Sequence, residues 1–211
     1  MEDNLKEPIL MELKDCNNIA FTIEPMKLED VDEILALCDY CVGKNMYSRK
    51  ELEEAIERPG YYFFILRSPS GKVAGYNYFF LSDLQEMSEF TKRPISHLAR
   101  MSTQKEPIIA DIRSLGIAEE YRHRGLAVAF MGWELEFLKK ETPAHVAMGA
   151  FWKPKGKYAM EWSLKALPFR YLEDAPLVWY NTPGLYCPVC KGRCQCDATI
   201  YYVQLREDMI T

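Results

Sequence analysis

The sequence predicts a single α+β domain in which helices cover both faces of one mixed sheet. Short runs rich in aromatic and β-branched residues alternate with segments whose apolar residues recur at helical spacing. The chain has 211 residues, of which 48% are hydrophobic, and this suits one well-buried domain better than two. One continuous sheet flanked by helices accommodates that alternation.

The expected strands are short apolar runs that end at proline, glycine or polar turns. The first follows a polar stretch, residues 1–18, which is expected to be an N-terminal arm ahead of a domain over 19–211. The strands are expected at residues 19–23, 61–67, 73–81, 108–117, 145–152, 177–180 and 199–205. The turn Ser68-Pro69-Ser70-Gly71 makes the second and third of them a hairpin.

The expected helices are marked by apolar periodicity and by capping residues. Ser48 is a typical N-cap, and Glu51 three residues later completes a capping box. Pro59 and Pro168 each follow the end of an expected helix. The helices are expected at residues 28–42, 48–58, 84–91, 126–140 and 158–167.

The charge and composition exclude some classes of protein. The formal net charge is -5, whereas general nucleic-acid binding needs a basic face, so no nucleic-acid partner is expected. No apolar run has the roughly 18 residues of a membrane helix, and the N-terminal sequence does not resemble a signal peptide. A cytoplasmic location is the expectation, with the seven cysteines as thiols or metal ligands.

The pattern Arg122-x-x-Gly125-x-Ala127 lies between an expected strand and an expected helix. A helix N-terminus offers unpaired backbone N–H groups and the positive end of a dipole, which together suit a phosphate group. Gly125 and Ala127 have little side chain to keep a ligand from that backbone. The segment therefore predicts a phosphate-binding turn, with Arg122 and Arg124 adding positive charge.

This segment resembles the acetyl-CoA motif of the GCN5-related N-acetyltransferases, the GNAT superfamily. Arg122, Gly125 and Ala127 occupy the three defining positions, and Ile117 and Tyr121 match the hydrophobic and aromatic positions before them. The order of expected elements also resembles that fold. The resemblance implies a single GNAT-like domain that transfers an acetyl group from acetyl-CoA to an amine, carried by a small molecule or a peptide.

The resemblance also implies which residues contact the cofactor. The backbone N–H groups of His123, Arg124, Gly125, Leu126, Ala127 and Val128 would hold the pyrophosphate. The preceding strand would splay from the next one, and its end, at Leu115, Gly116 and Ile117, would pair with the pantetheine arm. Gly116 fits either a β-bulge or a close approach of the ligand to the backbone.

Two residues are candidates for proton transfer. Asp111 lies in the strand ahead of the motif, where histone-type members of the family have a glutamate, and it is either the general base or a structural carboxylate. Many members use a tyrosine in the next-to-last helix to protonate the leaving thiolate. Leu164 stands at that position here, so Tyr158 is the substitute candidate, or a packing residue at a helix start. That departure keeps open an alternative, a non-catalytic module that binds CoA.

A cysteine-rich loop at residues 187–196 lies between the last two expected strands. Cys187-Pro188-Val189-Cys190 resembles a zinc knuckle, and Cys194 and Cys196 follow at once. Three interpretations remain open: a tetrathiolate zinc site, reduced thiols, and a redox-active or disulfide-bonded cluster. The knuckle lies outside the acetyltransferase pattern, and in the non-catalytic alternative it would serve recognition.

Overall fold

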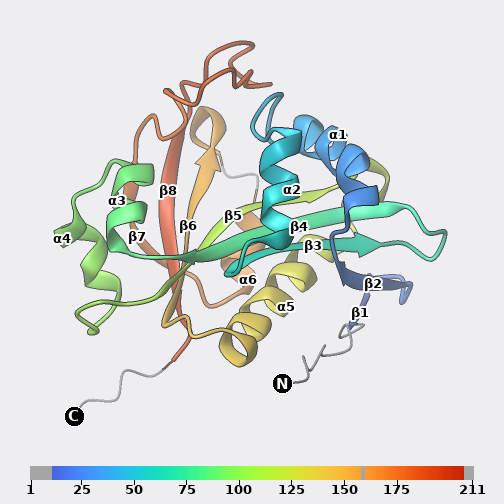
Figure 1. Ribbon diagram of the computed structural model, residues 1–211, viewed down its shortest axis with the longest axis horizontal. Coiled ribbons are helices and arrows are strands. Elements are labelled where there is room, and N and C mark those ends of the chain that lie inside the picture. Colours follow the sequence, from blue (N-terminus) through green and yellow to red (C-terminus); the bar gives the residue numbers. More distant parts are fainter. Residues whose placement is uncertain (1–10, 158–159, 207–211) are drawn as a thin grey trace.

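The computed structural model describes residues 11–157 and 160–206 and contains one eight-stranded sheet (Figure 1). The strand order is β1-β2-β3-β4-β5-β6-β8-β7. The strands are β1 Met11–Lys14, β2 Ala20–Pro25, β3 Tyr61–Arg67, β4 Val73–Ser82, β5 Ile109–Ile117, β6 Val146–Lys153, β7 Arg170–Ala175 and β8 Asp197–Gln204. Neighbouring strands are antiparallel except β5 and β6, so the sheet is mixed, as predicted.

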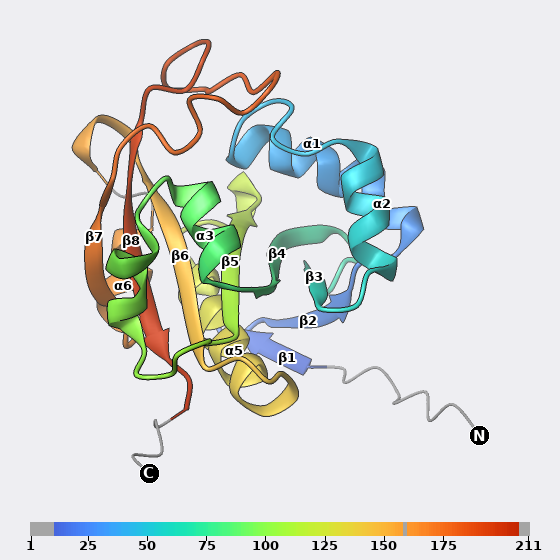
Figure 2. The same cartoon turned by 60° about the vertical axis from the view of Figure 1, so that its left-hand side comes forward.

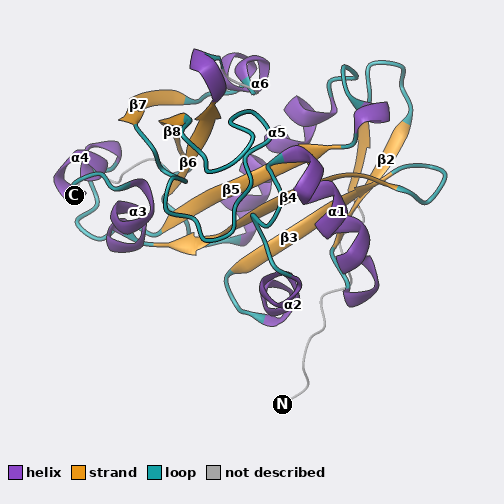
Figure 3. Ribbon diagram, turned by 90° about the horizontal axis from the view of Figure 1, so that it is seen from above, coloured by secondary structure: helices purple, strands orange, loops and turns teal. Residues whose placement is uncertain are grey.

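Helices cover both faces of the sheet, as predicted (Figure 3). The α-helices are α1 Val31–Cys41, α2 Arg49–Glu57, α3 Leu84–Thr91, α4 Ile95–Leu98, α5 Leu126–Glu141 and α6 Glu161–Ala166. Short 3₁₀ turns occur at Leu28–Asp30, Ala99–Met101, Glu119–Tyr121 and Pro154–Gly156. In the part of the chain that the structure describes, no helix combines the length and the apolar character needed to cross a membrane.

Alternation along β4 explains how the two helical layers form. Tyr76, Tyr78 and Phe80 lie on one face and pack with α1 and α2. Phe79, on the opposite face, packs with Leu135 and other residues of α5. Because successive side chains of a strand point to opposite faces, one aromatic strand supplies both cores.

The sheet divides between its two parallel strands. The register of β5 with β6 consists of three pairs and ends at Asp111↔Met148. Beyond that pair, β5 continues along β4 as far as Ile117, and β6 continues along β8 as far as Lys153. The carboxyl ends of β5 and β6 therefore diverge, as the family resemblance implied (Figure 2).

The β-bulge lies at Arg113 and not at Gly116, where the sequence allowed one. Tyr78 pairs with Ser114 and Phe79 with Ile112, so Arg113 is the extra residue of β5. Gly116 is regularly paired with Tyr76. A Cβ at Gly116 would lie 2.3 Å from Cε1 of Tyr76, so the glycine accommodates a buried ring of this chain.

Three other expectations need correction, and local geometry gives the reasons. The polar stretch before residue 19 contains β1, which the sequence did not reveal because a turn at Asp15 and Asn18 folds it back onto β2. The strand expected at 177–180 is a turn, because Pro176 has no N–H to donate and Leu177 has a φ of 54°. The strand lies instead at β7. Helix α4 was also missed, since one helical turn has too few residues to show periodicity.

Candidate functional site

A cavity of about 520 Å³ opens where β5 and β6 diverge. Ile112 and Leu115 of β5 and Phe151 of β6 line it. Its wall also includes Tyr78, from the sheet face that α1 and α2 cover, and Met131, from α5 on the other face. The cavity thus extends through the division in the sheet and connects the two helical layers.

The predicted phosphate-binding turn is a tight loop that ends at the first residue of α5. His123 has a φ of 60° and Gly125 a φ of 79°, so two residues with left-handed backbone shape the turn before the helix begins at Leu126. Gly125 is the N-cap residue, and the N–H groups of the first helical turn have no acceptor inside the helix. The predicted helix start is confirmed, and a helix N-terminus of this kind can accept an anion. Phosphate binding by the turn stays a prediction.

Open space surrounds Gly125 on the side where a side chain would project. A Cβ built at Gly125 meets no atom within 4 Å. The glycine is therefore required by its positive φ and not by packing.

The two arginines of the motif stabilise the loop through its backbone. Nε of Arg122 donates to the carbonyl oxygen of Ile117 over 2.9 Å, and its guanidinium lies 3.6 Å from Sγ of Cys41. Arg124 donates to the carbonyl oxygen of Glu120 over 2.8 Å and lies 3.8 Å from a carboxylate oxygen of Asp15. Arg122 remains exposed. Both positive charges therefore stand beside the helix N-terminus.

Asp111 is fully buried and forms an ion pair with Arg113. Its carboxylate lies 2.8 Å from Nε of Arg113. Burial raises the pKa of Asp111 to about 6, although the Arg113 charge acts in the opposite direction. Arg113 lines the cavity and stacks 3.7 Å over the ring of Phe90, whereas Asp111 is not among the described residues that line the cavity. Its role as a general base stays a prediction.

The second candidate for proton transfer, Tyr158, lies outside the described residues. Leu164, which stands where the family has a tyrosine, is buried against Met131 and Phe151. Its side chain packs beside the cavity but carries no proton to donate.

A hydroxyl pair that sequence reasoning missed lies in the cavity wall. The hydroxyl group of Tyr47, from the connection between α1 and α2, lies 2.8 Å from Oγ of Ser114 on β5. Burial raises the pKa of Tyr47, so this phenol keeps its proton. The two residues are 67 positions apart, and no local pattern signals that they meet.

Charged groups from α2 surround the cavity opening. Glu51, Glu54 and Arg58 line it and are all exposed. The rest of the wall is mainly apolar, and includes Phe80 and Trp179. Arg113 lies over the ring of Phe80 and Arg58 over that of Tyr61, so the carboxylates of Glu51 and Glu54 are the groups that suit an organic cation such as a protonated amine.

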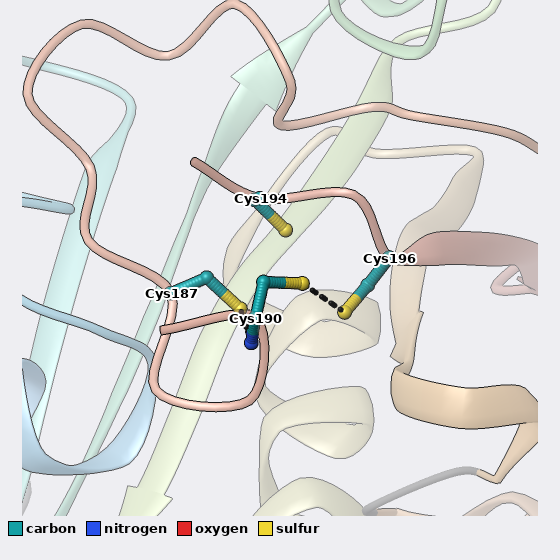
Figure 4. A group of neighbouring side chains, drawn as sticks. All are labelled: Cys187, Cys190, Cys194 and Cys196. Atoms are coloured by element: carbon teal, nitrogen blue, oxygen red, sulfur yellow. Dashed lines mark hydrogen bonds between the residues drawn. The ribbon is translucent and has the colours of Figure 1, made fainter. Parts of the chain in front are cut away.

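The four cysteines of the predicted knuckle converge at one point (Figure 4). Their Sγ atoms all lie within 4.8 Å of one another, and those of Cys190 and Cys196 are 3.5 Å apart. Cys187 and Cys194 also line the main cavity. The structure therefore brings the predicted ligands together and places them in the cavity wall.

Similar solved structures share the architecture of this chain at low sequence identity. NAA60 of Arabidopsis thaliana in complex with acetyl-CoA is 14% identical, with a TM-score of 0.66 over 87% of this chain and 98% of that chain. The loading GNATL domain of CurA from Lyngbya majuscula is 13% identical, with a TM-score of 0.63 over 89% and 99% of the two chains.

A third structure covers more of this chain. Ribosomal-protein-S5-alanine acetyltransferase from Vibrio fischeri is 12% identical, with a TM-score of 0.62 over 94% of this chain and 98% of that chain. The sequence itself matches no family model and no curated protein. The divided sheet, the loop before α5 and these likenesses agree with one another, and the chain has the GNAT acetyltransferase fold.

Proposed function

We propose that this protein is an N-acetyltransferase of the GNAT superfamily that moves an acetyl group from acetyl-CoA to an amine. The observation that carries the proposal is the cavity at the division between β5 and β6, together with the anion-type loop that begins α5. NAA60 of Arabidopsis thaliana, which shares this fold, forms a complex with acetyl-CoA. A cytoplasmic location and a small-molecule or peptide acceptor are part of the proposal.

In this proposal the loop holds the pyrophosphate of the cofactor. The backbone N–H groups of residues 123–128 donate to its oxygens, and Arg122 and Arg124 supply charge from the flanks. Leu115, Gly116 and Ile117 pair with the pantetheine arm through the backbone edge of β5 from which β6 has separated. The thioester then lies near Ser114, in the wall of the cavity.

The reaction needs one nucleophile, one electrophile and two proton transfers. The neutral amine attacks the thioester carbonyl carbon, a C–N bond forms, and the C–S bond breaks. The CoA thiolate takes a proton, and the amine nitrogen loses one. Tyr47 is placed to donate a hydrogen bond to the leaving thiolate, because its hydroxyl lies in the cavity wall and is hydrogen-bonded with Ser114. Burial raises the pKa of Tyr47, so its O–H stabilises the thiolate while the proton itself comes from solvent. Tyr158 is the second candidate for this step.

Asp111 has two possible roles in this scheme, and its contacts favour one of them. As a general base it would accept the amine proton through water, and its pKa of about 6 suits that task. However, Asp111 is buried beneath Arg113, and it is Arg113, not Asp111, that lines the cavity. We therefore favour a positioning role, in which Asp111 holds the guanidinium of Arg113 toward the acceptor.

A second function, a module that binds CoA without catalysing transfer, is motivated by Leu164. The family's helix tyrosine is replaced by this buried apolar side chain. The two functions differ in turnover and not in cofactor binding.

An acceptor screen separates the two functions. CoA release from acetyl-CoA is measured with polyamines, arylalkylamines, amino acids and peptides with free N-termini as acceptors. The proposal predicts amine-dependent release that saturates with one of these classes and an acetylated product detected by mass spectrometry. Cofactor binding without release above the hydrolysis background in every class would favour the non-catalytic module.

A further inference from the structure

The cysteine-rich loop carries chemistry that the acetyltransferase fold does not require. Tetrahedral zinc with Zn–S bonds of about 2.3 Å places its sulfur atoms roughly 3.8 Å apart. The four Sγ atoms here lie within 4.8 Å of one another, and small rotations of the side chains satisfy that geometry. Three of the four cysteines are buried, so the cluster is also shielded from solvent, as in a closed structural metal site.

The backbone around the first two cysteines is shaped for a bound ion. The N–H of Cys187 donates to the carbonyl of Gly192 over 2.8 Å, and Lys191 has a φ of 54°, so the segment is a tight hairpin. The N–H of Cys190 points at Sγ of Cys187 over 3.5 Å, and the N–H of Gln195 points at Sγ of Cys190 over 3.3 Å. Such N–H···S contacts orient and stabilise metal thiolates.

Convergence of four thiols favours a metal over disulfides. A disulfide joins two sulfur atoms and requires no third or fourth thiol beside it, whereas a tetrathiolate site requires all four around one centre. The four sulfur atoms here surround a common point (Figure 4). All four cysteines are free thiols in this structure.

The loop also forms part of the cavity wall. Leu185, Cys187 and Cys194 line the cavity and pack with Met46 and Trp152. The cluster is thus continuous with the surface that an acceptor would contact. The residues assigned to acetyl-CoA, 115–117 and 122–128, are not part of this cysteine cluster.

Backbone contacts couple the loop to the connection between α1 and α2. The N–H of Tyr186 donates to the carbonyl of Lys44 over 2.9 Å, and the side chain of Asn45 donates to the carbonyl of Gly184 over 3.1 Å. Gly43 fits closely here, since a Cβ would lie 2.8 Å from the carbonyl oxygen of Tyr186. That connection carries Tyr47, so the position of the loop affects the hydroxyl pair in the cavity.

We propose that Cys187, Cys190, Cys194 and Cys196 bind one zinc ion, and that this ion fixes the acceptor-side wall of the cavity. The zinc site is inferred from the geometry of the four cysteines alone. Its effect on acceptor binding rests on the proposed function. Metal removal is expected to loosen the loop and with it Met46 and the 43–47 connection. It should leave the loop before α5 in place, because no contact described above joins the two loops directly.

The first test measures the metal in the full-length protein, reduced and purified without chelator. Elemental analysis should give one zinc per chain, and replacement by Co²⁺ should give the visible absorption of a tetrahedral cobalt thiolate. Each of Cys187→Ser, Cys190→Ser, Cys194→Ser and Cys196→Ser should lower the zinc content well below one per chain. Cys16→Ser, at an exposed cysteine outside the cluster, should keep it at one.

The second test measures what the metal does. Stripping zinc with a strong chelator should change tryptophan emission, because Trp152 and Trp179 pack on the cluster. It should raise the acceptor KM about tenfold or more while the acetyl-CoA Kd stays unchanged. Added Zn²⁺ should restore both the emission and the KM.

Three results would overturn the proposal or its parts. No stoichiometric zinc or cobalt binding by the reduced protein, or a mass that shows disulfides among the four cysteines as purified, would refute the metal site. One zinc per chain with an unchanged acceptor KM after stripping would refute the role in the wall. If no amine is acetylated at all, the proposed function fails, while metal content and tryptophan emission still decide the zinc site.

Discussion

Two loops of the proposed site are built in different ways: the cysteine-rich loop lines the cavity, whereas the loop before α5 contributes none of the described residues that line it. The turn before α5 is closed by contacts between near neighbours, since Arg122 reaches back five residues to Ile117 and Arg124 four residues to Glu120. The same two arginines also contact the distant residues Cys41 and Asp15. The cysteine-rich loop contacts segments more than a hundred residues away, at Lys44 and Asn45. The turn on the cofactor side is therefore formed by local contacts and anchored by distant ones, whereas the acceptor side forms only when segments far apart in the sequence meet.

This difference suggests how the two substrates are recognised. A cofactor of constant structure can be held by backbone N–H groups whose positions depend on one turn and one helix start. An acceptor is recognised by side chains that come from separate elements, such as Tyr47, Arg113 and Leu185. Changes to the loop before α5 should then alter only the affinity for acetyl-CoA. Changes to the cavity wall should alter the acceptor KM or kcat.

The largest expected effect is that of Gly125→Val on the cofactor side. A branched side chain at φ 79° strains the turn and occupies the space beside the helix N-terminus. Loss of two or three charge-assisted hydrogen bonds should weaken acetyl-CoA binding about a hundredfold or more. Titration calorimetry measures the change.

Gly71→Val is the matched control for that variant. Gly71 has a φ of 83° and equally open surroundings, but it lies in the turn between β3 and β4. Gly71→Val should lose about as much folding stability as Gly125→Val but keep the wild-type affinity for acetyl-CoA. Equal loss of affinity in both variants would show that strain, and not the location of the loop, is responsible.

Tyr47→Phe should have the next largest effect, on chemistry and not on cofactor affinity. It removes the hydroxyl that pairs with Ser114, and loss of one hydrogen-bond donor to a developing negative charge typically costs about a hundredfold in kcat. Stopped-flow measurement of CoA release gives kcat, and calorimetry should show an unchanged acetyl-CoA Kd. Tyr62→Phe, on the sheet face that packs against α5, is the control. An unchanged kcat in Tyr47→Phe would transfer this role to another group, with Tyr158 the first to test.

Asp111→Asn distinguishes a positioning residue from a base. If Asp111 orients Arg113, the variant should raise the acceptor KM about tenfold and keep the acidic limb of the pH profile of kcat/KM. If Asp111 is the base, that limb, near pH 6, should disappear with a large loss of kcat. The pH profile of the variant therefore decides between the two roles.

Glu134→Gln should have the smallest effect on activity and a clear effect on stability. Glu134 of α5 is fully buried and accepts a hydrogen bond from Asn77 over 3.0 Å, and burial raises its pKa from 4.5 to about 8. Between these two values the folded state keeps a proton that the unfolded state has released. The free energy of unfolding therefore falls as pH rises through this window and levels off above pH 8.

Glutamine does not titrate, so the free energy of unfolding of Glu134→Gln relative to the wild type should grow by about 3 kcal/mol between pH 6 and pH 9. Urea denaturation at both pH values measures it. Glu136→Gln, an exposed position on the same helix, should show no such growth. A parallel pH dependence in the wild type and in Glu134→Gln would mean that the buried carboxylate does not titrate in this range.

Much of the fold was predictable because its signals are local. The capping box at Ser48 and Glu51 forms as expected, and β3 and α3 have the expected bounds. The turn before α5 follows from one glycine with positive φ and the helix it caps. The spacing of the four cysteines allowed a tetrathiolate site as one of three interpretations, and the structure brings their Sγ atoms together.

The remainder depended on tertiary context. Edge strand β7 carries charged residues, and the more strand-like segment after Pro176 packs as a turn with Val178 buried. The pair of Tyr47 and Ser114 and the bulge at Arg113 arise only when distant segments meet. Burial of Asp111 under Arg113 has the same origin, and it changes which role the carboxylate can play.

The measurement that tests the central claim most directly is calorimetric titration of acetyl-CoA into the wild-type protein, Gly125→Val and Gly71→Val. The account predicts saturable binding at one site per chain in the wild type and in Gly71→Val, and about a hundredfold weaker binding in Gly125→Val. No binding to the wild type, or equal affinity in all three proteins, would contradict the assignment of the loop before α5 as the acetyl-CoA site.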